Sequence, residues 1–341
     1  MEDGMIMVSI HCLTFNHAKY IRKTLDGFIS QQTDFRYEVL IHDDASTDGT
    51  QDIIREYEQK YPEIIKPIYQ KENQTSKGVK KLPTYNLPRA KGKYLAYCEG
   101  DDYWCDQHKL QKQVEALERH PECSFCTHFV DMISENGKQV LGSIPMNSLG
   151  EGVIEQETYL RYELINGWAS QTSSYLVRVK YLREYYEEMP LFRTKMRVGD
   201  FPMMLYLITK GKLFFYNETM SCYRVKSSGS YGERRSKDTL FNLCYFYTLI
   251  DGMAEYNKYT NYQYDRLIKA YIVARLEEVP RVEKKLIKEY DAVYFAEAYQ
   301  GKARHIRHLF RRKMPYLYLF LSNKWNACRA SRKKRDTEND K

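Results

Sequence analysis

The stretch of this sequence with the clearest chemical potential is Tyr-Cys-Glu-Gly-Asp-Asp-Tyr-Trp at 97–104. It places three carboxylates, Glu99, Asp101 and Asp102, within four residues, directly after the apolar and aromatic segment 93–98. Like charges held this close raise one another's pKa or attract a cation. The pattern therefore predicts either a solvated acidic turn or a site that holds something positive.

Two further polar groups follow apolar segments nearer the N-terminus. Residues 14–16 come directly after the strand pattern at 6–13, and residues 43–44 come after the pattern at 37–42. In open α/β sheets ligands bind beyond the carboxyl ends of the strands. Three polar groups at successive strand ends therefore predict one shared site.

The residue types in these groups suit a nucleotide diphosphate. Phe15 can stack on a base, and Asp44 can accept a hydrogen bond from a pyrimidine imide N–H. Asp101 and Asp102 can contact a ribose and hold a divalent cation, and one Asp suffices because Mg²⁺ takes few protein carboxylates beside phosphate oxygens. No GxGxxG follows the first strand and no Walker motif occurs, so neither dinucleotide nor P-loop binding is indicated.

The hydrophobic pattern predicts the elements that must position these side chains. Strands are expected at 6–13, 37–42, 64–69, 93–98 and 123–130, and helices at 17–32 (with Asn16 as N-cap), 50–61 and 106–120. This alternation predicts parallel βαβ units with right-handed crossovers. Further along we expect a helix at 155–165, a strand at 168–177, a helix at 201–212 with Asp200 at its start, strands at 213–216 and 219–224, and helices beyond 236.

With these motifs the chain resembles the family 2 glycosyltransferases of GT-A fold, of the bacterial polysaccharide, capsule or lipopolysaccharide type. The matching segments are VSIHCLTFN (8–16), HDDASTDGT (42–50), GKYLAYCEGDDYW (92–104), KLQKQV (109–114), GD (199–200) and YRV (223–225). The resemblance implies an α/β fold with a Rossmann-like, mostly parallel sheet flanked by helices. It divides the chain into a GT-A domain at 1–230, a helical extension at 231–300 and a basic amphipathic tail at 301–341.

The resemblance also implies a donor, a nucleotide-diphosphate sugar and in the first place a UDP-sugar. Asp44 would contact the base, and Thr14, Phe15 and Asn16 would line the space around it. Asp101 would contact the ribose or the sugar. The acceptor would be a glycan or a lipid-linked glycan, and the transfer would invert the anomeric configuration.

Two further roles concern the metal and the base. Asp102 would bind Mg²⁺ or Mn²⁺, and Asp200 would take the proton of the acceptor hydroxyl. Arg89 is placed weakly on the diphosphate side, and Asn86 receives no role. Many relatives have a His after the YRV stretch where this chain has Lys226; a protonated lysine cannot ligate a metal, although it can neutralise a diphosphate.

The charge of the chain is concentrated near its C-terminus. The net charge is +8, yet residues 1–300 carry 40 basic and 42 acidic side chains, whereas 301–335 hold twelve Lys or Arg and no acid. Aromatic and aliphatic side chains lie between these charges, which favours attachment to an anionic membrane surface. The body lacks the positive charge that nucleic-acid binding requires, so no nucleic-acid partner is expected.

Two alternatives to a glycosyltransferase remain open at this point. A sugar nucleotidyltransferase also pairs a metal with carboxylates, but its Gly-rich basic signature near the N-terminus is absent. A non-enzymatic, basic-tailed membrane or nucleic-acid scaffold would need basic residues across the body. No apolar run approaches the roughly 18–20 residues of a membrane span, and no signal peptide is indicated. We therefore expect a cytoplasmic protein, held peripherally on the inner face of the cell membrane.

Overall fold

The computed structural model describes residues 5–225 and 239–276, which fall into two compact units. The first comprises 5–189 and 200–225, and the second comprises 190–199 and 239–276. The predicted boundary near 230 and the tail at 301–341 lie outside these residues and stay predictions. Nothing in the sequence pattern indicated that 190–199 belongs with the later helices.

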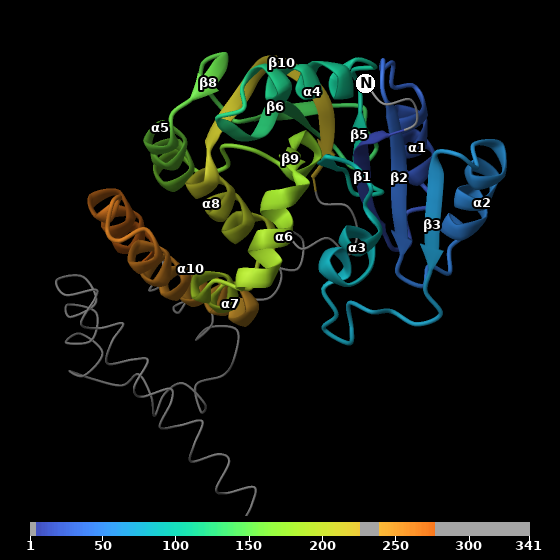
Figure 1. Cartoon of the computed structure of the whole chain (residues 1–341). Helices are drawn as coiled ribbons and strands as arrows, with labels where there is room; N and C mark the ends of the chain where they lie inside the picture. Colours follow the sequence, from blue (N-terminus) through green and yellow to red (C-terminus); the bar gives the residue numbers. More distant parts are fainter. Residues whose placement is uncertain (1–4, 226–238, 277–341) are drawn as a thin grey trace, which may run out of the picture. The chain divides into compact units, whose positions relative to one another are not determined.

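A ten-stranded sheet forms the centre of the first unit (Figure 1). Its path is β3-β2-β1-β4-β9-β6-β10-β5, with β7 beside β6 and β8 beside β10. The strands are β1 (Ile6–Thr14), β2 (Arg36–Asp43), β3 (Ile65–Tyr69), β4 (Tyr94–Tyr97), β5 (Tyr103–Trp104), β6 (Cys123–Ile133), β7 (Val140–Ile144), β8 (Gly152–Ile154), β9 (Leu176–Arg178) and β10 (Lys212–Arg224). The first four are mutually parallel, and antiparallel β5, β7, β8 and β9 make the whole sheet mixed. The α/β, GT-A-type prediction is confirmed.

Helices flank this sheet along the chain. The first unit has α1 (Ile21–Ile29), α2 (Thr50–Lys60), η1 (Leu82–Asn86) running into α3 (Leu87–Arg89), α4 (Lys109–Arg119), α5 (Gln156–Arg161) running into η2 (Tyr162–Asn166), η3 (Thr172–Ser174), α6 (Val179–Glu188) and α8 (Asp200–Lys210). The second has α7 (Leu191–Lys195) and α10 (Thr239–Tyr259), joined by the ring contact of Phe192 with Tyr256 at 5.2 Å. Within the described part of the chain, no helix is both long and apolar enough to cross a membrane.

The core beneath the strand ends follows from two periodicities. Ile10 and Cys12 of β1 alternate onto one face of the sheet, as strand geometry requires, and both are fully buried. Ile21, Leu25 and Phe28 of α1 recur at helical spacing and are also fully buried in the same cluster. Packing of α1 on β1 therefore fixes the loop that joins them.

Three local predictions were wrong. The N-cap of α1 is Tyr20 rather than Asn16, because the Asn16 side chain accepts a hydrogen bond from the next loop instead. The strand predicted at 168–177 begins only at Leu176, because Gln171 caps the 3₁₀ turn η3 through the backbone N–H of Ser173. The strands predicted at 213–216 and 219–224 form one strand, β10, with register shifts at the expected break.

Candidate functional site

The carboxyl ends of β1, β2 and β4 meet at one edge of the sheet. Thr14 pairs with Asp43 in parallel register, and the backbone N–H of Gly100 donates to the carbonyl of Leu13 at 2.8 Å. A Cβ atom on Gly100 would lie 2.8 Å from the Thr14 hydroxyl, closer than real Cβ atoms come to other atoms. Only glycine therefore lets the acidic loop approach the end of β1 this closely.

The loops after β1 and β2 are joined to each other by hydrogen bonds. The Asn16 backbone donates to Ser46 Oγ at 2.8 Å, and the Asn16 side chain accepts from the Thr47 N–H at 2.9 Å. Phe15 lies between Thr14, the last residue of β1, and Asn16. It is 44% exposed, so its ring is accessible for stacking. Thr14 is buried, and its hydroxyl has no hydrogen-bond partner among the described residues.

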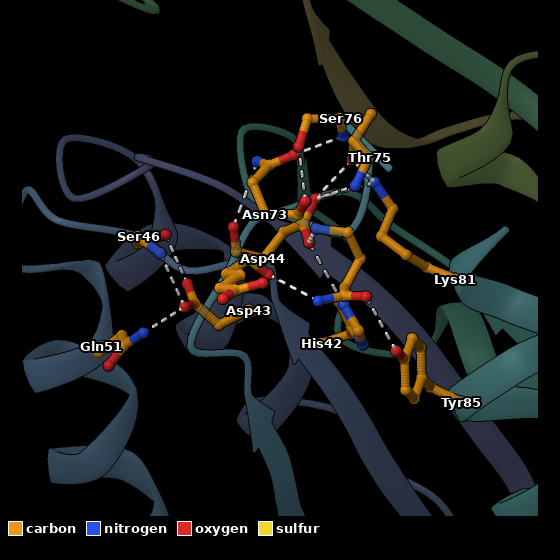
Figure 2. A network of polar contacts seen from close by, with 12 residues as sticks. His42, Asp43, Asp44, Ser46, Gln51, Asn73, Thr75, Ser76, Lys81 and Tyr85 are labelled. Atoms are coloured by element: carbon orange, nitrogen blue, oxygen red, sulfur yellow. Dashed lines mark hydrogen bonds and ion pairs between the residues drawn. The ribbon is translucent and has the colours of Figure 1, made fainter. Parts of the chain in front are cut away.

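Asp44 lies at the centre of a polar network (Figure 2). One of its oxygens accepts from the Gln74 N–H at 2.6 Å, and the other accepts from the Thr75 N–H at 3.1 Å and from the Thr75 hydroxyl. Lys81 Nζ lies 3.5 Å from the same carboxylate. Burial would raise the pKa of Asp44, but the bonds from Thr75 and Gln74 and the Lys81 charge lower it below the ordinary value. Asp44 is therefore an ionised acceptor.

A tilted pair of rings, with planes 38° apart, borders this carboxylate. The ring centroids of His42 and Tyr85 lie 4.6 Å apart, and His42 Nε2 is 3.8 Å from Asp44 Oδ1 (Figure 2). Burial lowers the pKa of His42 to about 4, against the opposing charge of Asp44. The imidazole is therefore neutral at pH 7. The negative charge of Asp44 is balanced instead by Lys81 and by the backbone N–H groups of Gln74 and Thr75.

Asp102 is the most buried of the three acids after β4, at 2% exposure. Its Oδ1 accepts from the backbone N–H of Arg224 at 2.8 Å, and its Oδ2 accepts from the Gln171 side chain at 3.1 Å. Burial, together with the charges of Asp101 and Glu99, raises the pKa of Asp102 well above its ordinary value. A cation at this loop would relieve that repulsion.

Glu99 and Asp101 are only partly buried beside it. Glu99 accepts from the Thr172 hydroxyl at 2.8 Å. Burial raises the pKa of Glu99 to about 7; the Thr172 bond opposes the shift, and the charges of Asp101 and Asp200 add to it.

The donors at this loop suit a hard divalent cation such as Mg²⁺ or Mn²⁺, because they are carboxylate oxygens. Each Asp102 oxygen also keeps a second lone pair beside its hydrogen bond. Across residues 5–225 and 239–276, no group of three or more His, Cys, Asp or Glu side chains is arranged to hold a metal alone. A cation bound here would need further oxygens from a ligand such as a diphosphate.

Asp200 is exposed at the first position of α8. Loss of hydration among the surrounding protein atoms raises the pKa of Asp200 above its ordinary value. The hydrogen bond from the Phe201 N–H opposes this shift. Its charge acts on Glu99, Glu163 and Tyr223, and adds to the raised pKa of each. The structure thus brings Asp200 within electrostatic reach of the acidic loop.

Sequence reasoning missed three residues that hold the acidic loop: Gln171, Thr172 and Arg224. Arg224 donates from Nε to the Asp101 carbonyl at 3.0 Å, and its guanidinium lies 4.4 Å from the centre of the Tyr20 ring. The sequence signals for these residues are the polar run before Leu176, unusual for a buried strand, and the YRV stretch at 223–225.

Arg89 is not brought to this cluster. Its guanidinium donates to the carbonyls of Lys66 and Ile41, both at 2.9 Å, and to the Asn86 side chain at 2.8 Å. Burial lowers its pKa to about 10. These bonds tie Arg89 to β2 and β3, and its weak assignment to the diphosphate side stays a prediction. Lys226 lies outside the described residues.

Comparison with known proteins identifies relatives of this chain. Residues 9–186 match the profile of the family described as Glycosyl transferase family 2. Over 130 residues the chain is 50% identical to the uncharacterised protein Rv1520 of Mycobacterium tuberculosis, a match that covers 38% of this chain and 37% of that relative. The chain thus matches well under half the length of that curated relative.

Two solved structures share the fold. Staphylococcus aureus TarS 1–349, in complex with UDP-GlcNAc, superposes with a TM-score of 0.51 at 17% identity, covering 82% of this chain and 83% of that one. The mannosyltransferase PcManGT of Pyrobaculum calidifontis, in complex with GDP-Man and Mn²⁺, gives 0.52 at 17% identity, covering 95% and 88%. At this identity the likeness establishes the fold alone.

Proposed function

Because the chain belongs to glycosyl transferase family 2, we propose that it transfers a sugar from a nucleotide-diphosphate donor to a glycan or lipid-linked acceptor, with inversion. The observation that carries this proposal is the convergence of Phe15, Asp44 and the acidic loop at one sheet edge, with Asp200 in electrostatic reach. A UDP-sugar is the first donor to test.

The donor would lie along the edge formed by β1, β2 and β4. Its base would stack on Phe15, which is exposed, and donate an imide N–H to Asp44, which is an ionised acceptor. Both Asp44 oxygens already accept bonds from residues 74–75. A base would therefore have to share the carboxylate with these groups or displace one of them. Asp101 would contact the ribose or the sugar.

Asp102, with Asp101 and Glu99 beside it, would hold Mg²⁺ or Mn²⁺. When bound, such an ion supplies positive charge that stabilises a departing diphosphate. Support comes from the burial of Asp102 beside two further carboxylates: burial first, and then the charges of Asp101 and Glu99, raise the pKa of Asp102. Gln171 and the Arg224 N–H would keep this carboxylate oriented.

Asp200 would act as the base. The acceptor oxygen would bond to the anomeric carbon while the bond from that carbon to the diphosphate oxygen breaks. The electron pair would leave with the diphosphate, and the acceptor proton would pass to an Asp200 oxygen. A pKa raised towards the operating pH makes a carboxylate a better proton acceptor.

A donor screen tests this function. The purified chain is incubated with UDP-, GDP- and dTDP-sugars and Mn²⁺, and release of the nucleotide diphosphate is measured. We expect release from one donor class, and Asp44→Ala should weaken it. If every nucleotide-sugar fails both to bind and to turn over, the proposal is wrong.

We also propose that the tail at 301–341 holds the enzyme on the inner face of the cell membrane. Support comes from its excess of basic residues and the interleaved aromatic side chains. A lipid-linked acceptor would then be presented at the same surface.

A further inference from the structure

Trp168 is exposed to solvent and has an unusual backbone conformation. Its side chain is 57% exposed, and its φ of 51° lies in the left-handed region that non-glycine residues rarely adopt. Strain of this kind persists where the surrounding structure imposes it, commonly at ligand sites. Trp104, by contrast, is 4% exposed in the core.

The contacts on both sides of Trp168 fix it. Its ring meets the Tyr223 ring edge to face, with centroids 6.4 Å apart at 87°. The next residue, Ala169, donates its N–H to Glu163 at 2.8 Å. Three residues on, Gln171 bonds to Asp102. Trp168 therefore belongs to the same short segment, 168–171, whose Gln171 side chain binds Asp102, the proposed metal ligand.

The surroundings of Trp168 are acidic. Burial raises the pKa of Tyr223, its ring partner, to about 12, and the charges of Asp102, Asp101, Glu99 and Asp200 contribute in that order. Glu163, which anchors the following residue, also feels the charge of Asp200. The exposed Trp168 ring therefore contacts Tyr223, a side chain within reach of the charges of the acidic loop and of Asp200, and it lies one residue from Ala169, which donates to Glu163.

We propose that Trp168 is the stacking platform for the acceptor, and that the acceptor is therefore a saccharide with a pyranose ring. This inference rests on the proposed function and narrows its acceptor. One face of a pyranose presents C–H groups that pack on an aromatic ring, while its hydroxyls donate to surrounding carboxylates such as Glu163. A simple lipid alcohol needs neither a flat ring nor a border of hydrogen-bond acceptors.

The first test is kinetic and uses the full chain with its best donor. Initial rates are measured for Trp168→Ala and Trp168→Phe with cellobiose, chitobiose and lactose as acceptor probes. We expect Trp168→Ala to raise the acceptor KM by about tenfold, the effect of losing one aromatic contact, and Trp168→Phe to restore part of it. Donor KM and acceptor-independent donor hydrolysis should not change.

Two control variants make this result specific. Leu141→Ala removes another exposed apolar side chain, 55% exposed on β7, and should leave both KM values unchanged. Phe15→Ala should raise the donor KM and spare the acceptor KM. If Trp168→Ala raises the donor KM instead, or changes neither, the proposal is overturned.

A binding measurement separates this inference from the proposed function. Saccharide probes should protect the exposed indole from acrylamide quenching in the wild type but not in Trp168→Phe, with or without a donor. Protection that persists in Trp168→Phe, or wild-type fluorescence that no saccharide protects, overturns the platform even if donor turnover is normal. Absence of all donor turnover would instead count against the proposed function.

Discussion

Replacement of Lys109 by Met should stabilise the protein and change how its stability depends on pH. Lys109 is fully buried in α4; its Nζ donates to Gln113 Oε1 at 2.6 Å and lies 4.2 Å from the centre of the Trp104 ring. No salt bridge joins it to a carboxylate within the described residues. Burial lowers its pKa from 10.5 to about 7. A buried ammonium without a charge partner is costly, so Met, similar in length and apolar, should fit better.

The size of the effect follows from the two pKa values. Between pH 7 and 10.5 the unfolded state holds the Lys109 proton and the folded state does not, so stability rises with pH across this window. One proton changes the free energy of unfolding by about 1.4 kcal/mol per pH unit. Lys109 therefore costs about 5 kcal/mol at pH 6 and about 2 kcal/mol at pH 9.

Urea unfolding at pH 6, 7, 8 and 9 measures this cost. The gain in free energy from Lys109→Met should shrink by about 3 kcal/mol between pH 6 and pH 9. Lys112→Met is the matched control three residues along α4, where the ammonium is paired with Asp106 and Glu218. That control should not stabilise. A gain from Lys109→Met that is the same at every pH would refute the reasoning.

Two further predictions concern the base and the tail. Asp200→Asn keeps the shape of the side chain but cannot accept a proton, so kcat should fall by roughly 10²–10⁴ while calorimetric donor affinity stays constant; lost donor binding would make Asp200 structural or donor-side. The full chain should bind vesicles of anionic lipid, more weakly as salt rises, whereas a chain ending at Gln300 should not, with donor turnover intact. Equal vesicle binding by both chains would remove the tail from the mechanism.

The strand ends were predictable because local patterns determine them. The alternation of apolar residues in β1 and their helical spacing in α1 predicted both elements. Parallel strands bring Thr14 and Asp43 to one edge of the sheet. The short spacing of Glu99, Asp101 and Asp102 likewise indicated an acidic loop. These features depend on residues close in sequence, or on one rule for parallel sheets.

The remaining features depend on contacts between distant residues. Gln171 bonds to Asp102, 69 positions away, and the Arg224 N–H reaches the same carboxylate across 122 positions. The use of Arg89 as a brace between β2 and β3 also depends on tertiary geometry, since sequence shows its charge but not its partners. Short strands such as β8, with three residues, are too short to show an alternating pattern of apolar and polar residues in the sequence.

Donor turnover as a function of Mn²⁺ concentration tests the central claim most directly. After treatment with EDTA, the wild type should release almost no nucleotide, and Mn²⁺ or Mg²⁺ should restore release to saturation. Asp102→Asn keeps one oxygen for the Arg224 N–H bond but removes the charge, so it should need far more metal and stay slow. Full transfer by the metal-free wild type would contradict the account.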